Sequence, residues 1–374
     1  MSKVLIVTND FPPRAGGIQS FVHALALGMP PEDVVVYAPR WDGAAEFDAQ
    51  QPFHVLRHPT SLMLPVPTVR TRAIAALHQY GCDRVIFGAA APLGLLAPAL
   101  REAGAQRIVA ITHGHEAGWA SLPVARSLLR RIGDSVDVVT YLGEYVRERL
   151  ARALTPEASS RMVRLAPGVD PTEFRPGAGG AEIRARHGLG ERPVVVCVSR
   201  LVERKGQDTL IEAWPAVLAR HPDAALLIVG GGPYERRLHA MAQGAAPGSV
   251  IFTGAVPREE LPAHYDAGDI FAMPCRTRRK GLDVEGLGIV YLEASATGLP
   301  VIAGDSGGAP DAVLEGETGF VVPGGDAGAL AARITELLDD PVAARAMGQR
   351  GLEWIDQEWR WDLVNERLQH ILDH

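Results

Sequence analysis

Short apolar runs alternate with stretches of helical periodicity along the first half of the chain. Apolar runs typical of buried strands occur at residues 4–8, 34–38, 84–88, 107–111 and 136–140. Apolar positions recur every three or four residues at 69–80, 92–103, 122–132 and 143–154, which is typical of helices. Buried strands that alternate with helices form a parallel, doubly wound sheet. We therefore predict an α/β domain in this half.

The same alternation predicts a second domain. Proline and glycine interrupt the pattern at residues 165–177, which we interpret as a linker. Strand-like runs then resume at 193–199, 224–229, 249–253, 269–273, 300–303 and 319–322, with helices between them from 206–220 to 326–338. Two helical segments, 341–357 and 359–372, close the chain, and the last has no strand to return to. We predict domains of residues 1–166 and 167–356, with 357–374 crossing back to the first.

Composition narrows the class of protein. The 374 residues suffice for two domains, and 47% of them are apolar, so a large core is expected. The net charge of −7 argues against a nucleic-acid partner. Cys82, Cys197 and Cys275 are widely separated, as expected in a reducing cytoplasm. No apolar run of about 18 residues is present, and the chain enters a strand at once, so we expect neither a membrane span nor a signal peptide.

The stretch 277–300, "TRRKGLDVEGLGIVYLEASATGLP", carries the densest candidate chemistry. Gly286 and Gly288 predict a tight loop, and the helix that follows is expected to end at Gly298. A glycine loop that opens a helix presents free N–H groups to a phosphate. Glu285 and Glu293 flank this loop. Both could simply be solvated, but the apolar run around Glu293 is a poor place for a carboxylate without a partner.

Two other predicted strand ends carry candidate residues in the first domain. Gly16 and Gly17 lie between a strand and a helix, in a turn that matches no standard phosphate-binding pattern and could be structural. His113 and His115 directly follow the strand at 107–111, where ligands collect in parallel sheets. They could be ordinary core histidines, but their spacing favours a functional role. Zinc is a poor alternative because no further His or Cys set accompanies them.

Cations occupy a strand end in the second domain. Arg200 and Lys205 lie in "SRLVERKG", just before a helix opened by Gly206. A helix N-terminus disfavours cations unless an anion joins them, so we predict an anion here rather than two solvated side chains. Val256 lies in "FTGAVPREEL", a further strand end whose backbone could face a nucleobase.

Taken together, these motifs resemble glycosyltransferase family 4, whose members are retaining enzymes of the GT-B fold. The resemblance covers essentially the whole chain and rests on the Glu285/Glu293 pair with "GGIQ", "THGHE", "PGVD", "SRLVERKG" and "LLIVGGGP" in this order. It implies two facing Rossmann-like domains. A closer similarity, carried by "VTNDFPPRAGGIQSF", "GAAAPLGLLA", "THGHEAGW" and "RTRRKGLDVEGLGIVYLEA", is to the actinobacterial subfamily that transfers the second mannose, α-1,6-linked, from GDP-mannose to phosphatidyl-myo-inositol monomannoside.

The resemblance implies roles for individual residues. Arg200 and Lys205 would hold the donor diphosphate and stabilise the leaving phosphate, and Glu293 would bind the ribose hydroxyls. The donor-binding set is Gly16, Gly17, Arg200, Lys205, Val256, Gly286, Leu287, Gly288, Ile289 and Glu293. Glu285 and His113 would contact the transferred sugar. Together with Arg200 and Lys205, they form the expected catalytic set.

Asp10 and His115 are the expected acceptor residues. The family retains the anomeric configuration, and the usual proposal is front-side attack with the donor phosphate as base. No metal or other cofactor is expected, because the two cations replace one. The stretch "TRRKG" (277–281) departs from the subfamily, where more glycine is expected before "LDVEG". The extra cations there would change the lip of the acceptor cleft.

The helix predicted at 122–132 carries a possible membrane surface. Arg126 and Arg130 form one stripe and apolar residues another, as in helices that lie on anionic membranes. We predict that Arg126, Arg130 and Arg131 dock the protein on the inner face of the plasma membrane, although an ordinary surface helix would show the same pattern. Two alternative functions remain open: transfer from a UDP-sugar to another acceptor, and non-catalytic binding of a sugar nucleotide.

Overall fold

The computed structural model describes residues 2–114, 116–120 and 122–374. The chain forms two compact units. Unit 1 ends at Pro167 and includes Trp361–His374, and unit 2 comprises Gly168–Arg360. The chain thus returns to unit 1 at Trp361, whereas the sequence predicted a return from residue 357.

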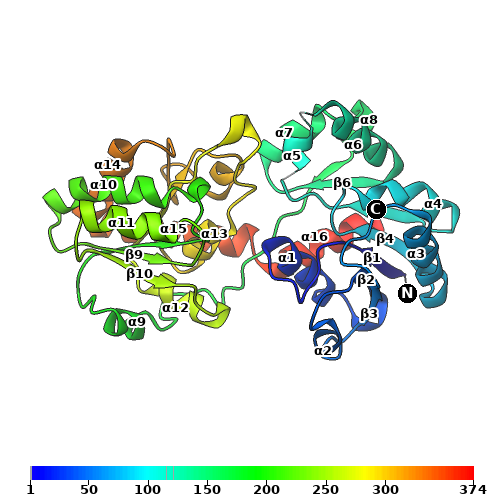
Figure 1. The fold of residues 1–374 in the computed structure, drawn as a ribbon, viewed down its shortest axis with the longest axis horizontal. Coiled ribbons are helices and arrows are strands. Elements are labelled where there is room, and N and C mark those ends of the chain that lie inside the picture. The colour runs from blue at the N-terminus through cyan, green and yellow to red at the C-terminus, as the bar shows by residue number, and fades with distance from the viewer. Residues whose placement is uncertain (1, 115, 121) are drawn as a thin grey trace. The chain divides into compact units, whose positions relative to one another are not determined.

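Unit 1 is built on a parallel sheet of seven strands in the order β3-β2-β1-β4-β5-β6-β7 (Figure 1). The strands are β3 (His54–His58), β2 (Val34–Pro39), β1 (Lys3–Val7), β4 (Cys82–Phe87), β5 (Arg107–Ala110), β6 (Val138–Tyr141) and β7 (Met162–Arg164). Val7 pairs with Phe87 and Phe87 with Ala110, so the loops that follow these three strands begin at one level.

Helices cover this sheet and connect its strands. They are α1 (Gly17–Leu27), α2 (Ala44–Asp48), α3 (Pro67–Tyr80), α4 (Ala97–Glu102), α5 (Glu116–Trp119), α6 (Pro123–Ser135), α7 (Glu144–Ala151) and α8 (Pro156–Ser160). The predicted strands and long helices are present, with ends shifted by a few residues. The edge strands β3 and β7 were not predicted, because the β3 sequence HVLRH carries polar residues and is only partly buried.

The last helix, α16 (Trp361–Asp373), belongs to unit 1. Its buried face comprises Val364, Leu368, Ile371 and Leu372. The Arg107 Nε group on β5 donates to the Ile371 carbonyl oxygen at 2.9 Å, and Arg84 on β4 forms an ion pair with Asp373 at 2.7 Å. These contacts confirm the prediction that the final helix packs on the first domain.

Unit 2 is built on a parallel sheet of six strands in the order β10-β9-β8-β11-β12-β13. They are β10 (Val250–Gly254), β9 (Ala225–Val229), β8 (Val194–Val198), β11 (Ile270–Met273), β12 (Val301–Gly304) and β13 (Gly319–Val322). Strands β8, β9 and β11 are buried along their whole length. This explains why each of them is a continuous apolar run rather than an alternating one.

The helices of unit 2 flank its sheet (Figure 1). They are α9 (Gly180–Arg186), α10 (Gln207–Arg220), α11 (Glu235–Ala245), α12 (Leu261–Asp266), α13 (Ile289–Ala296), α14 (Ala327–Asp339) and α15 (Pro341–Glu358). Both units are therefore Rossmann-like, as predicted. Among the residues described, no helix has the length and apolar character needed to cross a membrane.

Candidate active site

Most candidate residues of unit 2 follow the two strands at which the strand order of its sheet reverses. The chain builds outward from β8 through β9 to β10, and then in the other direction from β8 through β11 to β13. In such a sheet the loops after the two strands at the reversal diverge and leave a crevice at their carboxyl ends, where ligands bind. These strands are β8 and β11. The loop after β8 carries Arg200 and Lys205, and the segment after β11 leads to Glu285.

Gly206 fixes the end of the loop after β8. Its φ of 77° lies in the left-handed region, and a Cβ atom there would lie 2.0 Å from the Pro274 carbonyl oxygen. Only glycine satisfies both conditions. Gln207, the first residue of α10, donates from Nε2 to Ser199 Oγ at 2.7 Å, which ties the start of the helix to the end of β8. Lys205 is thereby held against the segment that follows β11.

A buried carboxylate joins the two loops. Glu285 is only 8% exposed, and its Oε2 accepts hydrogen bonds from Lys205 Nζ at 2.6 Å and from Arg204 at 2.7 Å. Arg204 also contacts Asp283 through Nε at 3.0 Å. Burial by itself raises the pKa of Glu285, but the two cations outweigh it and lower the pKa below its ordinary value. Glu285 is therefore a carboxylate held between two cations.

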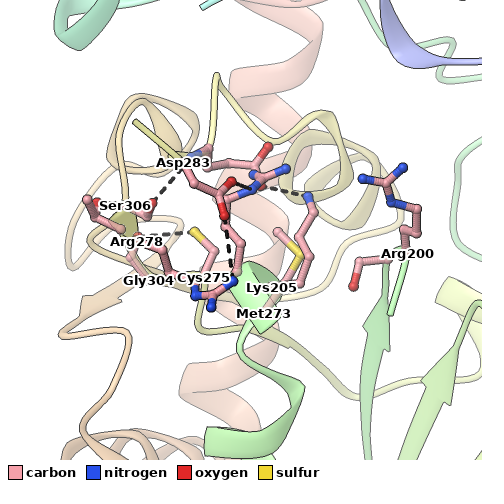
Figure 2. A network of polar contacts seen from close by, with 12 residues as sticks. Arg200, Lys205, Met273, Cys275, Arg278, Asp283, Gly304 and Ser306 are labelled. Atoms are coloured by element: carbon pink, nitrogen blue, oxygen red, sulfur yellow. Dashed lines mark hydrogen bonds and ion pairs between the residues drawn. The ribbon is translucent and has the colours of Figure 1, made fainter. Parts of the chain in front are cut away.

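Arg200 differs from Lys205, because none of the described residues gives it an anionic partner. Its side chain is exposed, and no described residue forms a hydrogen bond or ion pair with its guanidinium group. Figure 2 shows Arg200 beside Lys205 with no dashed line to its guanidinium group. It lines a hollow of about 530 Å³ together with Arg204, Arg278 and Arg279. Such a cation is available to a ligand anion without breaking an existing pair.

The loop before α13 has the features expected of a phosphate site. Gly288 has a φ of 83°, and a Cβ atom there would lie 2.5 Å from the Tyr291 ring. Among the described residues, the N–H groups of Gly286, Leu287 and Gly288 have no acceptor. These groups lie at the positive end of the helix, which favours an anion.

Glu293 is the fifth residue of α13 and is buried, with 8% exposure. Its Oε2 accepts a hydrogen bond from the Tyr265 hydroxyl at 2.7 Å. Burial raises the pKa of Glu293, and the bond from Tyr265 opposes that rise. The sequence predicted that Glu293 needs a polar partner, and this partner is Tyr265. Its hydroxyl supplies one of the hydrogen bonds that the carboxylate can accept.

Residues 277–281 are the stretch in which this chain has less glycine than the sequence comparison leads us to expect. Arg279 and Lys280 have φ values of 50° and 55°, a left-handed conformation that glycine adopts more easily. Arg278 forms ion pairs with Glu203 and Asp283, which hold this segment beside the loop after β8. Two of the cations, Arg278 and Arg279, line the same hollow as Arg200.

In unit 1 the order of the strands in the sheet reverses between β1 and β4. The candidate residues lie in the loops that follow β1 and β5. Gly16 caps α1, and Gly17 is its first residue. Asp10 accepts a hydrogen bond from Gln19 Nε2 at 2.8 Å. His113 Nε2 lies 2.5 Å from the Gly88 carbonyl oxygen, so Nε2 carries a proton and donates to it.

The structure thus groups the predicted residues within each unit. Lys205 contacts Glu285, Arg200 and the 286–288 backbone lie on loops that follow strands of the same sheet, and Glu293 lies in the second turn of α13. Val256 follows β10, two strands away from β8. His115 lies outside the described residues.

Arg204, Asp283 and Tyr265 were not singled out from sequence, because their partners are far away in the chain. Among the described residues, no three His, Cys, Asp or Glu side chains cluster as a metal site requires.

Comparison with known proteins identifies the class. Residues 15–173 match the model "Glycosyltransferase Family 4", and residues 181–354 match "Glycosyl transferases group 1". The crystal structure of Anabaena HepE in complex with UDP is similar over 99% of both chains, with a TM-score of 0.83 at 19% identity. WaaG, a glycosyltransferase of lipopolysaccharide biosynthesis, gives a TM-score of 0.68 over 99% of this chain and 100% of WaaG, also at 19% identity. The chain is a glycosyltransferase of the GT-B fold and belongs to family 4.

Similarity is much higher to particular members. A Mycolicibacterium smegmatis protein named GDP-mannose-dependent alpha-(1-6)-phosphatidylinositol monomannoside mannosyltransferase is 54% identical over 99% of this chain and 98% of its own length. A Corynebacterium glutamicum protein, whose name specifies a monoacylated form of the same acceptor, is 46% identical over 99% of this chain and 97% of its own length.

Proposed function

We propose that this chain transfers mannose from GDP-mannose to a phosphatidylinositol monomannoside, forming an α-1,6 linkage. The observation that carries the proposal is 54% identity over 98% of a relative named for this reaction. The site geometry supports it: among the described residues, a cation without an anionic partner, a paired cation, backbone N–H groups without an acceptor and two buried carboxylates belong to the loops and helices that follow the strands of the unit 2 sheet. These are the groups that a sugar diphosphate requires.

The cations would assist departure of the GDP. As the bond from the mannose carbon to the diphosphate oxygen breaks, negative charge develops on the β-phosphate. Arg200 and Lys205 would stabilise this charge, and the free N–H groups at 286–288 would contribute hydrogen bonds. Because Lys205 is paired with Glu285, the diphosphate would share Lys205 with that carboxylate or replace it.

The two carboxylates would hold different parts of the donor. Glu285 would accept hydrogen bonds from hydroxyls of the mannose, and Glu293 from hydroxyls of the ribose. In unit 1, Asp10, His113 and His115 would contact the acceptor or the transferred sugar, and Gly16 and Gly17 would approach the phosphates. We expect no metal requirement, because the cationic side chains supply the positive charge.

Mannose transfer is tested directly with purified protein, radiolabelled GDP-mannose and a synthetic phosphatidylinositol monomannoside. We expect a dimannosylated lipid, with phosphatidylinositol itself a poor acceptor. UDP-mannose and UDP-glucose serve as competing donors, and calorimetric titration of GDP and UDP measures the base preference. Preferential binding of UDP, or absence of product with every inositol lipid, would refute the proposal.

We also propose that α6 binds the anionic membrane that holds the acceptor. Arg126, Arg130 and Arg131 are exposed on this helix, whereas Leu129 and Ile132 are buried against unit 1. Leu122 lies at the N-terminal cap of the helix and is 50% exposed, and Val124 is 76% exposed. Exposed apolar side chains beside arginines can enter the interface of an anionic bilayer.

Liposome sedimentation tests the membrane proposal. We expect wild type to sediment with vesicles that contain phosphatidylinositol, and Arg126→Glu/Arg130→Glu to remain in the supernatant. Arg236→Glu/Arg345→Glu changes the net charge equally at exposed positions of unit 2 and should still sediment. Equal sedimentation of all three proteins would exclude α6 as the docking surface.

A further inference from the structure

A buried tyrosine stands behind the carboxylate assigned to the ribose. Tyr265 lies on α12, its side chain is fully buried, and its hydroxyl donates to Glu293 Oε2 at 2.7 Å. Glu293 lies on α13, so this bond joins two helices that pack on each other. Among the described residues, this is the one hydrogen bond to the Glu293 side chain, and Oε1 has no partner.

The Tyr265 ring has little freedom to move. Phe174 packs edge-on against it at 5.7 Å between ring centres, and the Phe271 ring lies at 5.6 Å. Burial, together with the nearby Glu293 carboxylate, raises the pKa of Tyr265 well above its ordinary value. The hydroxyl therefore keeps its proton and always acts as a donor toward Glu293.

Glu293 needs such a donor because burial works against its charge. Burial raises the pKa of Glu293, whereas the hydrogen bond from Tyr265 and the charges of Arg258 and Lys205 lower it; Glu173 raises it further. An ionised carboxylate can accept hydrogen bonds on both oxygens, but a protonated one presents an O–H group. The bond from Tyr265 to Oε2 fixes the orientation of the carboxylate and so also the position of Oε1.

We infer that Tyr265 is a positioning residue for the nucleotide: its hydroxyl orients Glu293 and keeps it ionised, so that the carboxylate can accept the ribose hydroxyls of the donor. This inference rests on the proposed function, which assigns Glu293 to the ribose. Tyr265 itself need not touch the donor. Because the ribose is unchanged by mannose transfer, the hydrogen bond contributes to donor binding rather than to the chemical step.

The test compares Tyr265→Phe with wild type and with Tyr37→Phe. Tyr37 is a buried tyrosine of unit 1 whose hydroxyl bonds His58, so Tyr37→Phe controls for loss of a buried hydroxyl. Calorimetry measures the affinity for GDP, 2′,3′-dideoxy-GDP and inorganic pyrophosphate. We expect Tyr265→Phe to weaken GDP about tenfold, the range for a hydrogen bond to a charged group, and to leave the other two affinities unchanged.

Two further measurements separate positioning from a general structural role. The KM for GDP-mannose should rise in Tyr265→Phe while kcat stays close to wild type. Without the hydroxyl the pKa of Glu293 rises further, so GDP affinity of the variant should decline at a higher pH than in wild type as the solution is acidified. Pyrophosphate affinity, which does not involve Glu293, should not show this difference.

The outcomes distinguish two failures. If wild type binds GDP and dideoxy-GDP equally, Glu293 does not hold the ribose, and that part of the proposed function fails together with the inference. If wild type prefers GDP and Tyr265→Phe keeps the same preference, the positioning role of Tyr265 is refuted while the proposed function stands. Equal losses for GDP and pyrophosphate in Tyr265→Phe would also refute it, because the damage would then extend beyond the ribose.

Discussion

Replacing Glu285 with glutamine should destabilise the empty protein and yet increase the effect of GDP on its stability. Glu285 is the shared partner of Lys205 and Arg204, at 2.6 and 2.7 Å. Removing one partner of a buried pair typically costs about 3–5 kcal/mol, because the remaining charge is left uncompensated. The Lys205 and Arg204 side chains retain 13% and 18% exposure, so we expect a smaller loss of about 2–3 kcal/mol.

A bound diphosphate would supply the missing negative charge. GDP should therefore raise the free energy of unfolding of Glu285→Gln by about 1 kcal/mol or more beyond its effect on wild type at the same concentration. Mannose transfer should nevertheless fall by about a hundredfold, as when one stabilising group is lost from an active site. Urea unfolding with and without GDP, combined with the radiolabel assay, measures both effects.

The pH dependence follows from the lowered pKa of Glu285. The pair contributes its full stability above the ordinary glutamate value of 4.5, and the contribution is lost as the pH falls through the lower value in the folded protein. The difference in stability between wild type and Glu285→Gln should therefore be constant near neutral pH and shrink below about pH 4.5.

A matched control for this prediction is Glu336→Gln. Glu336 pairs with Arg333 at 2.7 Å on the surface of α14, with side-chain exposures of 54% and 40%, and its loss should cost less than about 0.5 kcal/mol. If Glu285→Gln unfolds like this control, or if GDP stabilises it less than wild type, then the buried carboxylate is not the group that neutralises the phosphate-binding cations.

Three other changes test separate features of unit 2. Glu293→Gln should raise the free energy of unfolding of the protein without GDP by ~1 kcal/mol at pH 7, because burial raises the pKa of this carboxylate and disfavours its charge. The same change should weaken GDP binding. Urea unfolding measures the first effect and calorimetry the second. Arg200→Ala should weaken GDP at least about tenfold without changing the urea midpoint, because the side chain is exposed and has no anionic partner among the described residues; a shifted midpoint would contradict this. Gly206→Ala should cost more than ~2 kcal/mol, because its φ is 77° and its Cβ would clash with the Pro274 carbonyl oxygen; an unchanged thermal midpoint would contradict this.

Much of the fold could be predicted from local patterns. Continuous apolar runs such as residues 193–199 identified the buried strands, and Gly288 followed by apolar residues identified the start of α13. Both signals are local: a strand buried on two faces needs apolar side chains throughout, and a left-handed helix cap favours glycine. The β3 strand escaped prediction because it lies at the sheet edge and needs fewer apolar residues.

The candidate site was predictable only in part. Motifs indicated Arg200, Lys205, Glu285 and Glu293, because each occurs in a recognisable local pattern at the end of a strand or the start of a helix. Nothing in the neighbouring sequence marked Arg204 as a partner of Glu285. The two residues are 81 positions apart, and they meet because β8 and β11 are adjacent in the sheet.

The sequence by itself therefore determined the two parallel-sheet units, the loops that carry the chemistry and the kinds of side chain available to a sugar diphosphate. Only the tertiary structure decided which charges neutralise each other, that Arg200 has no anionic partner among the described residues, and that a tyrosine 28 positions away donates to Glu293. The physical reason is that periodicity encodes the burial of each element. The order and register of the strands decide which loop ends meet, and hence which buried groups share a hydrogen bond.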